Sequence, residues 1–120
     1  MSKILVIDDE ESVRMLLRAV LEEDGHEVRE ATDGRTGIAL YRQERADLVI
    51  ADILMPDLNG LDMIVELTRE FLDVKVIAIT GVYGEPDLLK RARLLGARHT
   101  FYKPFSPEEL LKVVRYELTH

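Results

Sequence analysis

The sequence contains no cysteine and no tryptophan, and only four of its 120 residues are proline. Without cysteine the chain can form neither disulfides nor zinc–thiolate sites, and thiol catalysis is excluded. The three histidines, His26, His99 and His120, lie far apart without the spacing of metal ligands, which disfavours a histidine-based metal site. No apolar run approaches the roughly 20 residues that a membrane span needs. A strand is expected to begin by the third residue, which leaves no room for a signal peptide, so we expect a cytoplasmic protein with no membrane partner.

Positive charge is also scarce, because 16 Lys and Arg residues stand against 23 Asp and Glu residues, for a net charge of −7. A surface of this sign argues against direct nucleic-acid binding, which requires cations that neutralise phosphates. The densest basic cluster, at residues 90–93, is typical of a solvated helix face. If the protein controls a gene, a second domain or a partner has to contact the DNA.

What the sequence does contain is a regular alternation of apolar strands and amphipathic helices in a chain that is 47% apolar and 32% charged. Its length suits one domain, residues 1–120. The hydrophobic pattern predicts strands over 4–7, 26–31, 48–51, 74–80 and 100–103. It predicts helices over 13–21, 33–45 and 60–72, a fourth from Pro86 to Gly96, and a fifth that Ser106 caps. Five such units predict the α/β class, as a doubly wound parallel sheet covered by helices on both faces.

Polar side chains stand where four of these strands end. Asp8 and Asp9 follow the first strand, Asp52 follows the third, and Thr80 and Lys103 close the fourth and fifth. In a doubly wound sheet, ligands bind outside the carboxyl ends of the strands. We therefore expect these five residues to surround one crevice.

The chemistry that fits this set is phosphoryl transfer to an aspartate. Three carboxylates in one crevice repel each other, and a divalent cation with oxygen ligands, best Mg²⁺, resolves the repulsion. An aspartate can act as the nucleophile, and positioned cations stabilise the transferring group. Asp52 is the better nucleophile because it ends a buried central strand. Taken alone, an aspartate after a strand is ordinarily a turn residue or helix cap, Lys103 before a proline is an ordinary strand exit, and Thr80 reflects strand propensity. It is the combination that points to chemistry.

The chain resembles the receiver domain of two-component response regulators, of the chemotaxis-regulator type, over essentially its full length. The matching segments are 4–10, 52–60, 79–81 and 103–105, which read ILVIDDE, DILMPDLNG, ITG and KPF. The resemblance implies a flavodoxin-like five-stranded sheet in the order 2-1-3-4-5 with five helices, and a cis peptide bond between Lys103 and Pro104.

The resemblance also implies the roles of the site residues. Asp52 would accept a phosphoryl group from a phosphohistidine, Lys103 would pair with the phosphoryl oxygens, and Thr80 would hydrogen-bond one of them. The implied Mg²⁺ ligands are Asp9, Asp52, the Leu54 backbone carbonyl and, through water, Asp8. The protein would be a signalling protein rather than an enzyme, although it would catalyse its own phosphorylation and dephosphorylation.

The main departure from the family concerns the switch residues. Signalling in the family couples Thr80 to an aromatic ring three positions before Lys103, and Thr100 occupies that position here. Tyr102, on the same face of the strand, or Tyr83 in the preceding loop is expected to replace the ring, unless the face of the fourth helix, fifth strand and fifth helix switches without one. In the family, two further positions tune the rate of dephosphorylation, and Leu54 and Val82 occupy them here. Both are apolar, which predicts a phosphoryl group that persists longer than in fast regulators.

Other functions fit the residues less well. A haloacid-dehalogenase-like phosphatase needs a second aspartate where Leu54 stands, and a flavodoxin needs a phosphate loop where Asp8 and Asp9 would repel phosphate. The serious alternative is a phosphorylation-independent interaction module of the same fold. The expected partners are a sensor histidine kinase or phosphotransfer protein and a downstream protein or fused output domain, with a possible homodimer on phosphorylation. The sequence does not decide whether the domain stands alone or belongs to a longer protein.

Overall fold

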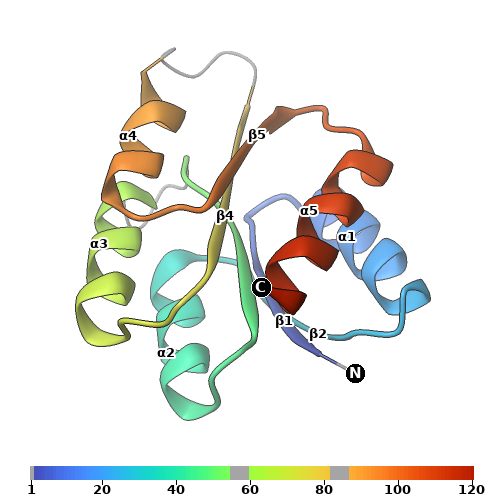
Figure 1. Ribbon diagram of the computed structural model, residues 1–120, viewed down its shortest axis with the longest axis horizontal. Helices are drawn as coiled ribbons and strands as arrows, with labels where there is room; N and C mark the ends of the chain where they lie inside the picture. Colours follow the sequence, from blue (N-terminus) through green and yellow to red (C-terminus); the bar gives the residue numbers. More distant parts are fainter. Residues whose placement is uncertain (1, 55–59, 82–86) are drawn as a thin grey trace.

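A five-stranded parallel sheet forms the centre of the molecule, and helices cover both of its faces (Figure 1). The computed structural model of the chain describes residues 2–54, 60–81 and 87–120. The strands lie in the order β2-β1-β3-β4-β5, which confirms the expected order and the α/β class. Their bounds are β1 (Lys3–Ile7), β2 (Glu27–Ala31), β3 (Leu48–Asp52), β4 (Val76–Gly81) and β5 (His99–Lys103).

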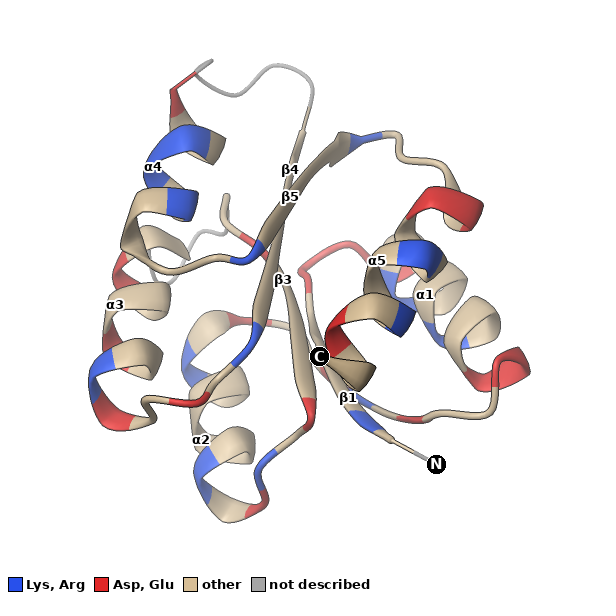
Figure 2. Cartoon of the chain, in the orientation of Figure 1, with Lys and Arg blue, Asp and Glu red and all other residues tan. Residues whose placement is uncertain are grey.

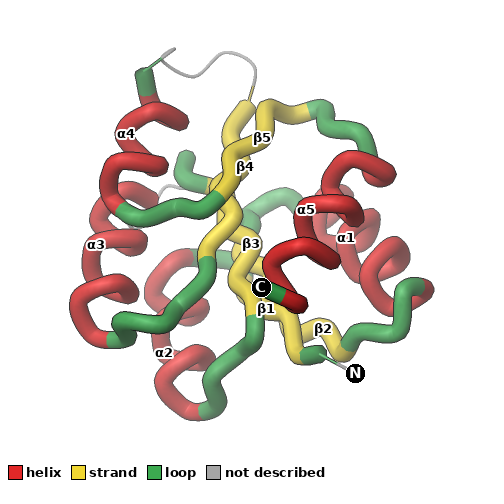
Figure 3. Tube along the Cα trace, in the orientation of Figure 1, coloured by secondary structure: helices red, strands yellow, loops and turns green. Residues whose placement is uncertain are grey.

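Two groups of helices enclose the sheet in three layers (Figures 1 and 3). One face is covered by α2 (Gly34–Gln43), α3 (Gly60–Glu70) and α4 (Leu88–Leu95), and the other by α1 (Glu11–Glu23) and α5 (Pro107–Thr119). Every residue of β3 is buried, as expected for a central strand between two helical layers. Among the described residues, no helix is both long enough and apolar enough to span a membrane.

Local signals place the helix ends close to where the sequence predicts them. The Asp33 side chain accepts a hydrogen bond from the Thr36 amide at 2.8 Å, and Ser106 Oγ accepts one from the Glu109 amide at 3.3 Å, so both residues cap helices. Gly25, with a φ of 91°, follows α1 as the sequence predicts. The remaining boundaries of helices and strands differ from the prediction by about one to three residues, which is ordinary for boundaries read from sequence.

Three side chains contradict the predicted helix faces. The apolar periods of the predicted helices 13–21 and 86–96 place Leu16 and Leu95 on the inward faces, but these side chains are 43% and 39% exposed. Leu16 lies at the margin of the α1 face that packs through Leu17 and Leu21, whereas Leu95 is the last residue of α4, where the chain turns at Gly96. Glu117 is the reverse case, since this carboxylate is 3% exposed on α5.

Glu117 is held by basic side chains from neighbouring elements. Its Oε2 lies 3.0 Å from His99 Nε2, its Oε1 lies 3.5 Å from Arg98 Nη1, and Lys75 donates to its backbone carbonyl. A buried carboxylate is tolerated only with such partners. His99 begins β5, Arg98 directly precedes it, and Lys75 directly precedes β4. The periodicity of α5 alone could not reveal these partners.

Gly60, the first residue of α3, lies directly against the chain that leaves the site strand β3. Its amide donates to the Ile53 carbonyl at 3.2 Å, and a Cβ added there would lie 2.2 Å from Ile53 Cα. A side chain at this position would therefore push apart α3 and the segment after Asp52. The resemblance also implies a turn from Asp57 to Gly60, and its residues before Gly60 lie outside the described part of the chain.

Replacing Gly60 with alanine is predicted to destabilise the protein by about 2 kcal/mol or more, because the new methyl group overlaps backbone atoms. Urea unfolding measures the change. Gly81→Ala is the matched control, since no atom of the described residues lies within 4 Å of a Cβ added there, and it should shift the free energy of unfolding by less than about 0.5 kcal/mol. Equal losses in the two variants would contradict the steric argument.

Candidate functional site

The site lies at the edge of the sheet where the parallel strands end. Asp8 directly follows β1, Asp52 is the last residue of β3, and Lys103 is the last residue of β5. Adjacent strands are in register up to this edge, with Ile7 opposite Ala51 and Asp52 opposite Ile79. The sheet therefore brings together residues almost one hundred positions apart, as the sequence predicted.

The Lys103 ammonium is the centre of the cluster. Its Nζ lies 3.0 Å from Asp8 Oδ2, 3.0 Å from Asp52 Oδ2 and 2.7 Å from Glu10 Oε1. The lysine side chain is mostly buried, at 13% exposure, so its ion pairs with the two buried aspartates are little screened by water. One ammonium thus faces three carboxylates.

Glu10 was not among the site residues that the sequence singled out. Its ion pair with Lys103 is the shortest of the three, and its side chain is 56% exposed. The sequence signal was its position directly after Asp8 and Asp9, in a segment that Figure 2 shows as a continuous acidic loop between β1 and α1. Its place in the sequence does not show whether the Glu10 side chain points toward the sheet. That orientation depends on the position of Lys103 at the end of β5.

The two buried aspartates share one local geometry. Asp8 Oδ1 accepts a hydrogen bond from the Glu10 amide at 2.8 Å, and Asp52 Oδ1 accepts one from the Leu54 amide at 2.9 Å. Each carboxylate bonds the amide two residues further on, which is the turn that aspartate favours after a strand. This bond fixes one oxygen of each carboxylate, so the other oxygen faces Lys103.

Burial opposes the ionisation of both aspartates. Asp8 and Asp52 are 1% and 3% exposed, and this desolvation raises the pKa of both carboxyl groups despite the amide bonds and the lysine. Burial alone would lower the pKa of Lys103, but its hydrogen bonds to Glu10, Asp8 and Asp52 outweigh that effect and raise the pKa. The lysine is therefore charged at neutral pH, and the cluster carries an excess of negative charge.

The donor set fits a hard divalent cation. Carboxylate oxygens of Asp8, Asp9, Glu10 and Asp52 all lie within 4.8 Å of one another, and Asp9 and Glu10 are exposed and can adjust. Mg²⁺ prefers oxygen ligands, needs few carboxylates and keeps several waters. An ion at this point would offset the charge that Lys103 leaves uncompensated. The expected Leu54 carbonyl ligand stays a prediction.

The remaining predicted residues lie on β4 and β5. Thr80 is fully buried, and its hydroxyl has no hydrogen-bond partner in the part of the chain that the structure describes. Tyr102 is the register partner of Thr80 and is 45% exposed. It lines a hollow of about 620 Å³ with Thr100 and residues of α4, so Thr100 and Tyr102 do share a face. The Lys103–Pro104 bond is cis, as expected. Val82 and Tyr83 lie outside the described residues.

A parallel α/β sheet that ends in an acidic crevice with one lysine is the architecture that response regulator receivers share. The sequence model of the family described as "Response regulator receiver domain" matches residues 4–115. The chain therefore belongs to the response regulator receiver family.

Individual relatives agree with this assignment. The chain is 40% identical over 116 residues to Protein PilH of Pseudomonas aeruginosa, covering 95% of both chains. It is 34% identical to Response regulator SaeR of Staphylococcus aureus over 99% of this chain but only 51% of SaeR, so it spans about half the length of that relative. Its structure matches a receiver domain protein from Clostridium thermocellum with a TM-score of 0.92 and 31% identity, over 99% of this chain and 95% of the other.

Replacing Asp52 with asparagine is predicted to stabilise the metal-free protein near neutral pH. The pKa of Asp52 is raised in the folded state, so ionisation costs stability as the pH rises through that pKa, and asparagine does not ionise. Urea unfolding in a chelating buffer measures the difference, which should shrink as the pH falls through the raised pKa of Asp52 and the wild-type carboxyl group takes up its proton. A gain that is independent of pH would show that the carboxylate charge is not its cause.

Proposed function

We propose that this domain is a phosphoacceptor. Asp52 takes a phosphoryl group from a phosphohistidine on a sensor histidine kinase or phosphotransfer protein, with Mg²⁺ bound beside it. The observation that carries the proposal is the buried Asp52 carboxylate, 3.0 Å from the Lys103 ammonium and grouped with three further carboxylates. The phosphorylation-independent docking module has less support, because a module that only docks partners has no need of this costly buried charge cluster.

The chain's own residues can divide the work of the reaction. The Leu54 amide holds Asp52 Oδ1, which orients the carboxylate so that Oδ2 lies on the side of Lys103. An Asp52 oxygen attacks the phosphorus, the bond from phosphorus to the donor imidazole breaks, and the imidazole nitrogen leaves with the electron pair and takes up a proton. Lys103 balances negative charge on the phosphoryl oxygens, as positioned cations do in phosphoryl transfer. Bound Mg²⁺ would supply further charge neutralisation and keep Asp52 ionised despite its burial.

Thr80 and Tyr102 form the part of the proposal that concerns signalling. The Thr80 hydroxyl, buried at the end of β4, is placed on the strand next to Lys103 and would donate to a phosphoryl oxygen. Its movement would change the packing beside Tyr102, whose ring stands in for the aromatic residue that Thr100 replaces. The α4–β5–α5 face would then present a changed surface to a downstream protein, an output domain or a second copy of the chain. A cytoplasmic location is part of this proposal.

Incubation with acetyl phosphate and Mg²⁺ should add one phosphoryl group to the protein, because this small donor needs no docking surface. Intact-mass spectrometry measures the gain. Asp52→Asn should show none, because the amide is not a nucleophile, and a chelator should abolish the gain in the wild type. Lys103→Met should lower the extent of phosphorylation strongly while the protein stays folded.

The same samples test the finer expectations. The added mass should persist for minutes rather than seconds after the donor is removed, because Leu54 brings no polar group to position a water, and NMR should show a changed environment for the Tyr102 ring. A wild type that gains no mass would transfer support to phosphorylation-independent docking. A gain that survives in Asp52→Asn would contradict the assignment of the acceptor.

A further inference from the structure

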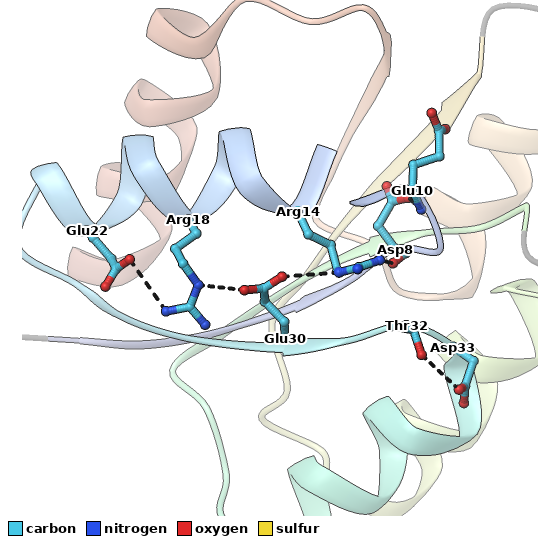
Figure 4. Close-up of polar contacts among 8 residues, drawn as sticks. All are labelled: Asp8, Glu10, Arg14, Arg18, Glu22, Glu30, Thr32 and Asp33. Atoms are coloured by element: carbon cyan, nitrogen blue, oxygen red, sulfur yellow. Dashed lines mark hydrogen bonds and ion pairs between the residues drawn. The ribbon is translucent and has the colours of Figure 1, made fainter. Parts of the chain in front are cut away.

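Arg14 connects helix α1 to the chain segment that carries the acidic cluster. Its Nη1 donates to the backbone carbonyl of Asp8 at 2.8 Å, and its Nε donates to Glu30 Oε1 on β2 at 3.1 Å (Figure 4). The side chain is 14% exposed, so these bonds form largely out of water. The guanidinium therefore lies beneath the acidic segment and touches its backbone rather than its carboxylates.

The carbonyl that Arg14 contacts belongs to the peptide unit between Asp8 and Asp9. This unit is planar, so fixing its oxygen fixes the direction in which the chain leaves Asp8 and enters Asp9. The Asp8 amide on the other side donates to the Ala31 carbonyl of β2 at 3.1 Å. Asp8 is thus held from both sides, by β2 through its amide and by α1 through its carbonyl.

Glu30 anchors the guanidinium that reaches Asp8. Its Oε2 accepts a second bond from Arg18 Nε at 2.5 Å, one turn further along α1. Arg18 chiefly, and Arg14 in addition, outweigh partial burial and hold the pKa of Glu30 below its usual value, so this carboxylate is ionised at neutral pH. The bond from Nε to this charged carboxylate restricts Arg14 to the rotamer in which Nη1 meets the Asp8 carbonyl.

We propose that Arg14 is a positioning residue for the divalent cation: with Glu30 as its anchor, it holds the Asp8–Asp9 peptide so that both carboxylates aim at the ion. This inference rests on the proposed function, because it assumes that Mg²⁺ binds at the cluster. Outer partners that orient metal ligands contribute to affinity without touching the metal. Among the bonds that the described residues make, Arg14 meets the acidic segment at the Asp8 carbonyl and takes up no carboxylate oxygen of Asp8, Asp9, Glu10 or Asp52.

The competing explanation is that Arg14 merely ties α1 to β2. Arg18 separates the two explanations, because it lies on the same helix and binds the same glutamate (Figure 4). Among the bonds that the described residues make, Arg18 contacts Glu30 and Glu22 and none joins it to Asp8. A purely structural role predicts similar consequences for the two arginines, whereas the positioning role predicts a difference in metal binding.

The test is a titration of the ¹⁵N-labelled protein with MgCl₂, followed by NMR at the amides of residues 8–10. Arg14→Met should raise the dissociation constant of Mg²⁺ by about tenfold, the lower range for loss of an outer metal partner. Arg18→Met should leave it within about twofold, since the Asp8 carbonyl keeps its donor. Urea unfolding of both variants without metal shows whether each is folded at the titration temperature, and Arg14→Lys supplies a second variant if methionine prevents folding.

The outcomes distinguish this inference from the function on which it rests. If the wild type does not bind Mg²⁺ at all, the proposed function fails. If the wild type binds but both Arg14 variants stay within twofold of it, the positioning role is overturned. An Arg18→Met variant weakened as much as Arg14→Met would overturn it too, because the effect would then follow the ion pairs with Glu30 rather than the bond to Asp8.

Discussion

The contact of the Lys103 ammonium with Asp8, Glu10 and Asp52 is the constraint on which the site depends. It places a single positive charge at the meeting point of β1, β3 and β5. Without it the two buried aspartates would face each other unpaired, which in a dry environment costs several kcal/mol. Lys103 pairs with both buried aspartates, but one ammonium does not balance the charge of the cluster, since Asp9 and Glu10 add two more carboxylates. A site in this state would gain stability from a divalent cation, as the proposed function requires.

The fold serves this arrangement by keeping both layers of helices away from the carboxyl edge of the sheet. Parallel strands need crossover helices, which bury the strands on both faces and leave only their ends accessible. The central strand β3 can therefore end in a buried carboxylate, while Asp9 and Glu10, in the loop before α1, remain exposed. Gly60 contributes to this arrangement because its lack of a side chain lets α3 begin against the backbone just after Asp52.

The fold and the main site residues could be predicted from sequence because both follow local rules. Apolar runs of strand length, alternating with amphipathic helices, dictate a parallel sheet, and the ends of its strands then meet without any knowledge of contacts. What could not be predicted depends on distances between segments. Glu10 joins the site only because β5 brings Lys103 beside it. Arg14 reaches the Asp8 carbonyl while Glu30 on β2 holds its guanidinium. Glu117 is buried where His99 and Arg98 can pair with it. The predicted burial of Leu16 and Leu95 is wrong for a simpler reason. The period of apolar residues along a helix shows neither how wide the packed face is nor where the helix ends.

The central claim is that burial beside too little positive charge destabilises the ionised form of Asp52, and that a divalent cation would stabilise it. A ¹³C NMR titration of the Asp52 side-chain carboxyl, with and without Mg²⁺, tests it most directly. The account predicts a pKa above the usual aspartate value in the metal-free protein and a lower pKa when Mg²⁺ is present. An ordinary pKa that does not respond to Mg²⁺ would contradict it.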